Sequence, residues 1–431
     1  MPGRRFDALP SFEPAARLRP VALVRAGTSL PPAPYAAVER DLADSAATVS
    51  LSSGDTTLMA GWDGERVSIT ITVGSATSHH ISRRHATTQD PSALALSLTG
   101  PHVSAYVLEA GAWVARAIVD LAATHPILDV HDESWLADLV SDGDRAGTFG
   151  GLGLRDLRLV TNADGSPYAV GERLFLTATS AGPGGFRTSH TSVWSLDPVG
   201  LGFEHRADLF FRRPEIFEHH GVYGDHATHL LRDGARWLVA TSTWGDFDRH
   251  KNPRVTTILA TTSADVLSGC HVLDTEPLVL PGGPTSVGTW DPHLVRTDSG
   301  WLATFVSASR FFRFHPVIAE GSELTDLTHR AAATDRIACE GPTLAHLDGA
   351  WRVLASDGRD EQRGRRASYP VFDLDLHELG TLDADYPTNL PWPTLVPTGG
   401  EWLLIGFDGT RYGGPLLGYG THGDLVVQRS T

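Results

Sequence analysis

Cysteine, methionine and lysine are all scarce in this chain. It has 2 cysteines, 2 methionines and a single lysine, Lys251, among 431 residues. Cys270 and Cys339 lie far apart in the sequence, which excludes a disulfide framework and a CxxC metal site. No window approaches about 18 uninterrupted apolar residues, so the sequence predicts no membrane-spanning helix. The opening MPGRRFDALP has no apolar stretch behind its arginines and does not resemble a secretory signal, so we expect a cytoplasmic protein.

Positive charge is also in short supply. The 35 lysine and arginine residues are outnumbered by 51 aspartate and glutamate residues, which gives a net charge of -16. An acidic chain repels the phosphates of nucleic acid and of anionic membranes, so we expect neither as a partner. Self-association into a homo-oligomer stays open.

Helical periodicity is nearly absent. Short pieces near 35–43 and 132–140 are the exceptions, and each predicts one helix. Elsewhere, short runs of valine, leucine, threonine and aromatic residues are broken by glycine, proline, aspartate and asparagine, which is typical of many short strands. The segment ERVSITITV places valine and isoleucine on one face and serine and threonine on the other, as in a sheet with one wet face. We therefore predict an all-β protein with a β-sandwich-like accessory domain in residues 1–140.

Residues 150–431 repeat one pattern, namely an acidic or aromatic start, a short apolar strand, a turn and a strand led by tryptophan. The repeats are DHATHLLRDGARWLVATSTWG from Asp225, WDPHLVRTDSGWLATFVSAS from Trp290, EGPTLAHLDGAWRVLASDG from Glu340 and PWPTLVPTGGEWLLIGFDG from Pro391, with a weaker copy from Arg155. A spacing of roughly 50 to 70 residues suits a four-stranded blade with loop insertions. Five such units predict a five-bladed β-propeller as the catalytic domain.

In a propeller the innermost strands line a central channel, so residues at their starts converge from several blades. The positions before the shared apolar strand are Asp156, Asp225, Asp291, Glu340 and Trp392. Alignment of the repeats on their prolines puts Asp156 in register with Asp291, and it puts Asp225 in the register of Glu340, one step earlier. A single acidic residue before a strand is a common turn residue. Several carboxylates in matched places indicate a site, because close like charges raise each other's pKa and need a functional reason.

Glycoside hydrolysis is a reaction that needs such a group of carboxyls. One carboxyl protonates the leaving group, a second acts as base or nucleophile, and a third can hold the pKa of the acid up. Sugar sites also need aromatic platforms and planar donors. The residues of the repeats and their flanks that could line such a site are Arg155, Asp225, His226, Trp244, Trp290, His293, His315, Arg359, Trp392 and Arg411.

A cluster of histidines raises the question of a metal. The segment EHHGVYGDHATH contains His219, His220, His226 and His229, a spacing that could hold zinc. The HExxH pattern is absent and the surroundings indicate strand and loop. We therefore expect pocket-wall and strand residues here, with no metal ligand among them.

The segments around three of the carboxylates resemble glycoside hydrolase family 43 and related five-bladed propeller glycosidases. CEGPTLAHLDGAWRVLAS is similar to the general-acid segment of that family, WDPHLV to the segment with the pKa-modulating aspartate, and LRDLRLV to the first-blade segment with the base. The resemblance implies an inverting glycosidase with Asp156 as base, Asp291 as pKa modulator and Glu340 as acid. The Asn-Asp-Pro-Asn and Glu-Cys-Pro signatures of fructan-acting relatives are absent, so we do not expect a retaining fructosidase.

The sequence thus predicts a glycosidase that acts on a small glycoside or oligosaccharide, with an arabinofuranoside or another pentoside favoured. The resemblance implies no required cofactor and allows a structural calcium ion in the propeller channel. Two alternatives stay open. One is a glycosyl-transferring or phosphorolytic enzyme on the same propeller, and the other is a non-catalytic carbohydrate-binding propeller.

Overall fold

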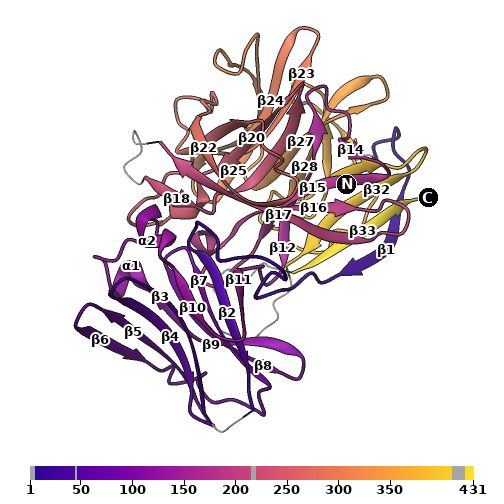
Figure 1. The fold of residues 1–431 in the computed structure, drawn as a ribbon. Coiled ribbons are helices and arrows are strands. Elements are labelled where there is room, and N and C mark those ends of the chain that lie inside the picture. The colour runs from indigo at the N-terminus through magenta and orange to yellow at the C-terminus, as the bar shows by residue number, and fades with distance from the viewer. Residues whose placement is uncertain (1–4, 44–45, 215–219, 410–422) are drawn as a thin grey trace.

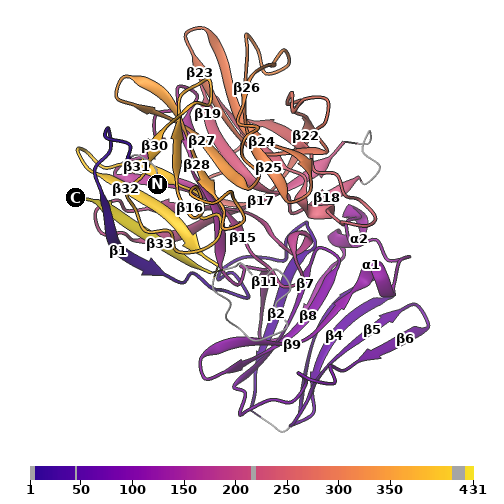
Figure 2. The same ribbon diagram turned by 180° about the vertical axis from the view of Figure 1, so that it is seen from behind.

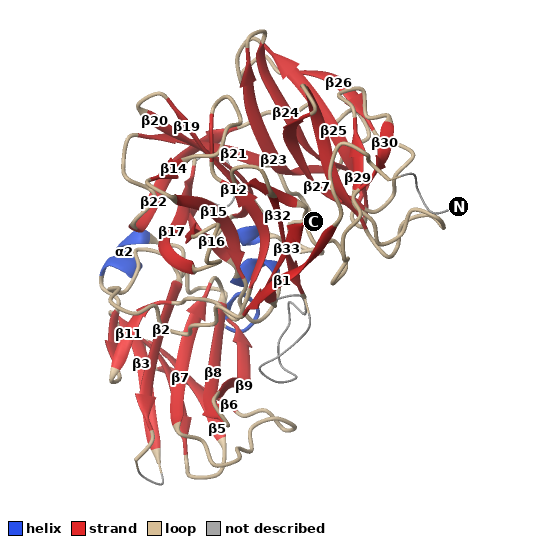
Figure 3. Ribbon diagram, turned by 90° about the vertical axis from the view of Figure 1, so that its right-hand side faces the viewer, coloured by secondary structure: helices blue, strands red, loops and turns tan. Residues whose placement is uncertain are grey.

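The computed structural model describes residues 5–43, 46–214, 220–409 and 423–431, and it contains a β-sandwich and a five-bladed β-propeller (Figure 1). Strands dominate both parts, as Figure 3 shows, so the all-β prediction is confirmed. The helices are α1 (Leu121–Thr124), α2 (Glu133–Ala137), and two single 3-10 turns, η1 (Phe186–Thr188) and η2 (Trp244–Asp246). Within the described part of the chain, every helix is too short to cross a bilayer.

The sandwich consists of two five-stranded antiparallel sheets. One sheet has the order β10-β3-β4-β5-β6, with β10 (Val140–Asp142), β3 (Ala47–Ser53), β4 (Thr56–Trp62), β5 (Val67–Val73) and β6 (Ala76–His80). The other has the order β11-β2-β7-β8-β9, with β11 (Arg145–Thr148), β2 (Tyr35–Asp41), β7 (Ala93–Thr99), β8 (His102–Glu109) and β9 (Ala112–Asp120). The valine and isoleucine positions 67, 69 and 71 are buried in one core between the sheets, which confirms the alternation.

One of the two predicted helices is wrong. Residues 35–41 form strand β2, which pairs on both sides with β7 and β11. Alanine and glutamate favour a helix locally, but burial between two neighbouring strands outweighs that preference. The prediction near 132–140 is confirmed in its centre, because Asp132 caps α2 by accepting a hydrogen bond from the Ser134 amide at 2.7 Å.

The propeller blades follow one another in chain order, as Figure 2 shows from behind. Blade one contains β12 (Leu154–Leu159), β15 (Arg173–Ser180), β16 (His190–Leu196) and β17 (Phe203–Arg213), with β14 (Ala169–Val170) and β18 (Gly221–Tyr223) added at its edges. Blade two contains β19 (His226–Asp233), β20 (Arg236–Ser242), β21 (Thr257–Thr262) and β22 (Gly269–Pro277), with β13 (Thr161–Asn162) parallel to β19. The outer strands β17 and β22 pair in parallel and join these two blades.

The remaining three blades are separate four-stranded sheets. Blade three contains β23 (Gly288–Thr297), β24 (Gly300–Arg310), β25 (Arg313–Gly321) and β26 (Thr328–Ala332). Blade four contains β27 (Cys339–Leu347), β28 (Ala350–Asp357), β29 (Pro370–Phe372) and β30 (Glu378–Thr381). Blade five contains β31 (Thr394–Pro397), β32 (Trp402–Asp408), β33 (Asp424–Ser430) and β1 (Phe12–Leu18). The predicted five-bladed propeller is confirmed.

Strand β1 departs from the expected division of the chain into 1–140 and 150–431. It does not join the sandwich, and it pairs antiparallel with β33 as the outermost strand of blade five (Figure 1). The sequence hides this strand because it is an outer strand whose side chains are mostly exposed and show no alternation of apolar and polar residues. Phe12 is its one buried side chain.

The innermost strands of blades one to four share a bulge near their starts. In each, the pairing with the next strand slips at the same place, and the residue there has a positive φ, namely Asp156 at 52°, Ala227 at 63°, Asp291 at 57° and Gly341 at 66°. Bulges of this kind re-aim side chains and are common next to active sites. The predicted match of Asp156 with Asp291 is therefore confirmed, whereas the register of Glu340 in blade two belongs to His226 and not to Asp225.

The sandwich packs against blade one through a mixed interface. Tyr35 stacks on Phe210 with ring centroids 5.3 Å apart, and its hydroxyl donates to the Arg187 carbonyl at 2.9 Å. Arg25 is buried over the Trp194 ring and donates to Ser180 Oγ at 3.2 Å. Because aromatic stacking, a cation–π contact and hydrogen bonds act together, the two parts form a continuous structure.

We predict that Phe12→Ala destabilises the propeller. Phe12 is 5% exposed and lies in a core cluster with residues of blades four and five. Removal of a buried phenylalanine side chain costs roughly 3 kcal/mol or more. Thermal and urea unfolding should show this loss, and Glu13→Ala, at the exposed next position of β1, should leave stability within about 0.5 kcal/mol of the parent. Equal stability of the two variants would contradict the closure of blade five by β1.

Candidate active site

Three carboxyl groups meet at one end of the propeller, where the innermost strands begin; this end is called the front end below. Asp156 lies on β12 of blade one, Asp291 on β23 of blade three and Glu340 on β27 of blade four. The Gly341 amide, next to Glu340, donates to Asp291 Oδ2 at 3.4 Å. The charge of Asp156 acts on both other carboxyls. The structure therefore brings together the three carboxyls that the sequence predicts as catalytic.

Glu340 is the most open of the three groups. Its side chain is half-buried, whereas Asp156 is 4% exposed and Asp291 is 2% exposed. The indole Nε1 of Trp290 donates to Glu340 Oε1 at 3.0 Å. Burial and the charge of Asp156 raise the pKa of Glu340, and Arg155 and the Trp290 hydrogen bond lower it, so that the net pKa is about 7. A carboxyl with this pKa can hold a proton at neutral pH and release it to a substrate.

Asp156 is paired with the residue before it in the chain. The Arg155 Nε donates to Asp156 Oδ1 at 2.9 Å, a charge-assisted hydrogen bond. His226 lies close enough for the Asp156 charge to act on it, although burial lowers the pKa of His226 to about 4. The His226 Nδ1 faces the Gly224 carbonyl at 3.1 Å, so it carries the proton and Nε2 is an acceptor. Within the described chain this Nε2 is buried and has no hydrogen-bond partner.

Asp291 shares its environment with a buried arginine. Burial and the charges of Glu340 and Asp156 raise the pKa of Asp291 well above its usual range, and Arg158 opposes them. The Arg158 guanidinium donates to the Asp291 carbonyl at 2.9 Å and to the Pro342 carbonyl at 3.0 Å. Burial lowers the pKa of Arg158 to about 10. Because Coulomb repulsion is mutual, Asp291 and Glu340 titrate as a pair that resists losing its last proton.

An aromatic wall borders the carboxyls. The rings of Phe186, Trp244, Trp290 and Phe311 follow one another at centroid distances of 4.7, 5.4 and 6.1 Å. The predicted platforms Trp244 and Trp290 are largely buried inside this wall. The half-buried Phe186 and Phe311 present the more open rings. The aromatic surface available to a ligand therefore differs from the predicted one.

Asp225, which the sequence places beside Glu340, lies away from the three carboxyls. It is fully buried and accepts hydrogen bonds from Arg213 at 2.9 and 2.5 Å and from the Gly245 amide at 2.9 Å. Asp225 thus anchors the η2 turn that carries Trp244. The shared bulge explains the difference, because it places His226 one residue later in the register of Glu340.

Other predicted binding residues are distributed over the propeller. Trp392 is 2% exposed and lies beneath the Arg158 guanidinium at 4.5 Å, so it is a core residue. His293 lies at the opposite end of the channel. Phe314 packs into the aromatic cluster, so strand alternation points His315 to the other face of β25. Arg359 is an exposed loop residue, and Arg411 lies outside the described residues.

Arg158 is the central residue that the sequence does not reveal. A single arginine in a strand of alternating residues resembles an ordinary solvent-facing position, yet Arg158 is completely buried. The available signal is its place two residues after Asp156, between Leu157 and Leu159. The sequence does not point to Phe186 either, because this residue reaches the site from a loop outside the repeat.

The histidine-rich segment does not form a metal cluster in the described residues. His219 lies outside them, and His220 lies near the sandwich in a separate pocket. His226 and His229, both on β19, make unrelated hydrogen bonds. The described chain has one group spaced for a metal, Asp373, Asp375 and His377, in an exposed turn of blade four.

The sandwich contributes to the aromatic wall through an ion pair. Arg187, next to Phe186 in η1, donates from Nη2 to Asp120 Oδ2 at 2.9 Å. Asp120 ends strand β9 of the sandwich and also caps α1. Phe186 stacks on Trp244 with an interplanar angle of 19°. The contacts therefore run from the sandwich through Arg187 to the ring that borders Trp290 and Glu340.

Comparison with known proteins finds no matching family model and no matching curated protein. Solved structures do show similarity. A GH43 enzyme from Xanthomonas citri complexed with xylose has 12% identity and a TM-score of 0.43, over 64% of this chain and 87% of that chain. A family 117 glycoside hydrolase from Zobellia galactanivorans has 10% identity and a TM-score of 0.44, over 65% and 85%. An inulosucrase from Halalkalicoccus jeotgali bound to kestose has 14% identity and a TM-score of 0.45, over 60% and 76%.

These similarities are distant. Family 43, which the sequence motifs resemble, is among the families represented. The blades and their closure are established by the strand pairing of this chain itself. The carboxyl groups and their surroundings are the features of this chain that indicate an enzymatic activity.

We predict that Asp120→Asn loosens the aromatic wall. Asparagine still caps α1 through its carbonyl oxygen, so the substitution removes mainly the charge that holds Arg187. The near-UV circular dichroism of the coupled Trp244 and Trp290 rings should weaken, while the far-UV spectrum stays unchanged. The control is Asp142→Asn, which breaks the pair with Arg40 at 2.7 Å on the sandwich surface. Identical near-UV spectra for both variants would contradict the claim that the Asp120–Arg187 ion pair holds the aromatic wall in place.

Proposed function

We propose that the protein is a glycoside hydrolase in which Glu340 is the general acid and Asp156 the general base. The observation that carries the proposal is the half-buried Glu340 carboxyl, whose pKa is raised to about 7 and which faces two further carboxyls from other blades. Glycoside hydrolysis is the reaction that uses one protonated and one ionised carboxyl across a bond.

Glu340 is suited to protonate a leaving group. In the protonated acid, the oxygen that accepts the Trp290 N–H at 3.0 Å is the carbonyl oxygen, so the proton is on Oε2. Half-burial leaves room for a glycosidic oxygen to reach that proton. As the bond to the anomeric carbon breaks, the proton moves to the departing oxygen and Glu340 becomes a carboxylate. The Trp290 N–H and the nearby Arg155 favour that ionised form.

Asp156 is suited to activate water. Arg155 binds Oδ1 and fixes the orientation of the carboxylate, so Oδ2 is the oxygen that takes a proton from the attacking water. The hydroxide portion of the water bonds to the anomeric carbon, and its proton remains on Asp156.

Asp291 supports the acid and does not contact the breaking bond in this proposal. Its carboxyl repels a second negative charge on Glu340, which keeps the pair protonated to a higher pH. Charge on Asp156 adds to the same effect. The proposed roles therefore agree with those that the motif resemblance implies, including inversion at the anomeric carbon. The proposed substrate is a small glycoside, with an arabinofuranoside or another pentoside favoured by the same resemblance.

We predict that Glu340→Gln lowers turnover of aryl arabinofuranosides or xylosides with poor leaving groups by roughly 10²–10⁴-fold. Dinitrophenyl glycosides need little protonation on departure, so their turnover should fall much less. Asp156→Asn should lose activity on both kinds of substrate, because water activation is needed for each. Steady-state kinetics over a leaving-group series measures the difference.

The control for these variants is Glu323→Gln, an exposed glutamate of blade three. It should keep the parent rates. Proton NMR of the first-formed sugar in the same reactions reports the anomeric configuration, and a retained configuration would contradict Asp156 as base. Unchanged turnover in Glu340→Gln would overturn the assignment of the acid, and sugar binding without any turnover would favour a non-catalytic propeller.

The upper limb of the pH–rate profile should move in opposite directions in two variants. That limb reports loss of the proton from the acid, near pH 7 in the parent. Asp291→Asn removes the second carboxyl of the coupled pair, so the last proton of the pair is lost more easily and the limb moves to lower pH by roughly one unit. Trp290→Phe removes a donor that favours the ionised form, so the limb moves to higher pH. Shifts of kcat/KM in the same direction for both variants would contradict these roles.

A further inference from the structure

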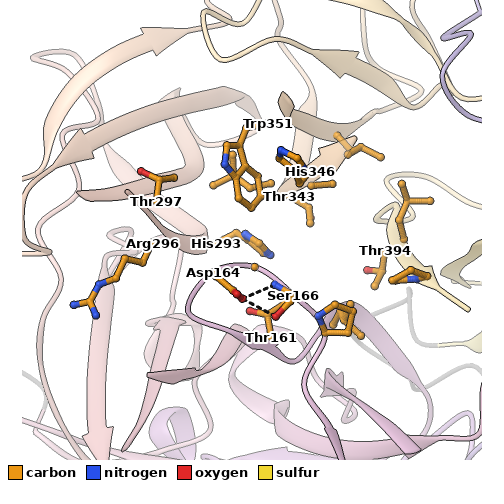
Figure 4. Close-up of a pocket in the computed structure, with 18 of the residues that line it drawn as sticks. Thr161, Asp164, Ser166, His293, Arg296, Thr297, Thr343, His346, Trp351 and Thr394 are labelled. Carbon is orange, nitrogen blue, oxygen red and sulfur yellow. Dashed lines mark hydrogen bonds between the residues drawn. The ribbon is translucent and has the colours of Figure 1, made fainter. Parts of the chain in front are cut away.

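A second cavity lies at the rear end of the propeller, where the innermost strands finish. Its volume is about 540 Å³, within the range of small-molecule sites. The ends of β12, β23, β27 and β31 line it, together with the loop of residues 163–167 and the start of β28. Figure 4 shows the lining side chains around the cavity, with Trp351 and His346 on one side and Asp164 and Ser166 on the other.

The rear cavity is separate from the carboxyl groups of the front end. The Arg158 guanidinium lies between them and donates to Thr343 Oγ1 at 2.7 Å and to the Asp291 carbonyl at 2.9 Å. Thr343 lines the cavity, whereas Asp291 belongs to the front end. A ligand at the rear end therefore cannot contact the residues assigned to catalysis.

His293 lines the cavity and has a buried ring nitrogen without a hydrogen-bond partner in the described part of the chain. It is 2% exposed, and within the described chain its Nδ1 has no hydrogen-bond partner. Its ring stacks on His229 with a centroid distance of 3.9 Å. Both ring nitrogens of His229 have hydrogen-bond partners, because its Nδ1 accepts from the Leu294 amide at 3.1 Å and its Nε2 donates to Thr161 Oγ1 at 3.2 Å. Figure 4 places His293 among the lining side chains, and a buried polar side chain without a partner is costly unless a ligand or water completes it.

Trp351 supplies an aromatic wall beside His293. Its indole is half-buried and meets the His346 ring edge-on at a centroid distance of 5.3 Å. The close approach of Gly165 supports the other side of the indole, since a Cβ at this position would lie 2.6 Å from Trp351 Cη2. The positive φ of 81° at Gly165 also suits glycine. The loop of residues 163–167 therefore holds the indole in a defined position.

Two of the charged side chains around the cavity, Arg296 and Asp164, already have partners. Arg296 Nη1 binds Asp233 Oδ1 at 2.9 Å, and its guanidinium lies over the Trp301 ring. Asp164 accepts from the Ser166 amide at 3.0 Å and from its hydroxyl at 2.6 Å. Burial keeps the inner histidines neutral, because it holds the pKa of His293 well below its usual range. A cavity with neutral histidines at its inner wall and an aromatic side suits a neutral ligand that is rich in hydroxyl groups.

We propose that the rear cavity is a second binding site of the protein, which takes a neutral mono- or disaccharide. The apolar face of a sugar ring lies on the Trp351 indole, and a sugar hydroxyl bonds to the His293 imidazole. The threonines at positions 161 and 394 supply further oxygen atoms at the inner wall. This site does not rest on the proposed function, because binding there requires no turnover at the front end.

The test uses the full-length protein and four probes, D-xylose, D-glucose, cellobiose and sucrose, in saturation-transfer NMR titrations. Trp351→Ala should weaken binding of the responding probe at least tenfold. Gly165→Ala, whose methyl group displaces the indole, should weaken it as well. The matched control is Trp113→Ala, a half-buried tryptophan of the sandwich, which should bind like the parent. Unfolding curves establish that each variant is folded.

The outcomes separate the two ends of the propeller. Turnover of aryl glycosides by Trp351→Ala should equal that of the parent. If the parent turns over no glycoside, weaker sugar binding by Trp351→Ala still supports the rear site. If no sugar binds at the rear end, activity at the front end is unaffected. A crystal of the complex should show the sugar against Trp351. Equal affinity of Trp351→Ala and the parent, or no saturable binding of any probe, would overturn the rear site.

Discussion

One buried guanidinium connects the strands that carry the candidate catalytic groups. Arg158, two residues after Asp156 in blade one, donates to carbonyl groups of Asp291 in blade three and Pro342 in blade four. It also lies over the Trp392 ring of blade five, so four blades meet at a single side chain. A buried charge is tolerated only when its hydrogen bonds are made, and loss of a partner typically costs about 3–5 kcal/mol. The relative positions of Asp156, Asp291 and Glu340 therefore depend on the same contacts that keep Arg158 buried.

This arrangement divides the channel into two ends of different character. The front end concentrates carboxyl groups, and burial together with the Asp156 charge raises the pKa of Glu340 to about 7. The rear end holds neutral, stacked histidines, threonine hydroxyls and an indole. The sandwich supports the front end, because Asp120 binds Arg187 and thereby the Phe186 ring of the aromatic wall. The sandwich thus contacts a loop that the propeller repeat does not contain.

Much of the fold could be predicted from the sequence, because strand alternation and repeated turns are local signals. The carboxyls Asp156, Asp291 and Glu340 were found by comparing repeats. The failures involve information that is not local. Strand β1 is mostly exposed and has its partner at the far end of the chain. The bulge shifts the register by one residue, so Asp225 was placed where His226 lies. The burial of Arg158 is hard to predict from the sequence, since its partners are backbone carbonyls and a threonine hydroxyl of distant blades.

The central claim is that burial and the Asp156 charge hold a proton on Glu340 at neutral pH, and carbon NMR of the side-chain carboxyl tests it most directly. Protein labelled with carbon-13 at glutamate Cδ is titrated with pH, and Glu340→Gln identifies the resonance. The account predicts a midpoint at about 7 that falls in Asp156→Asn. A midpoint at the ordinary glutamate value of about 4.3, unaffected by Asp156→Asn, would contradict it.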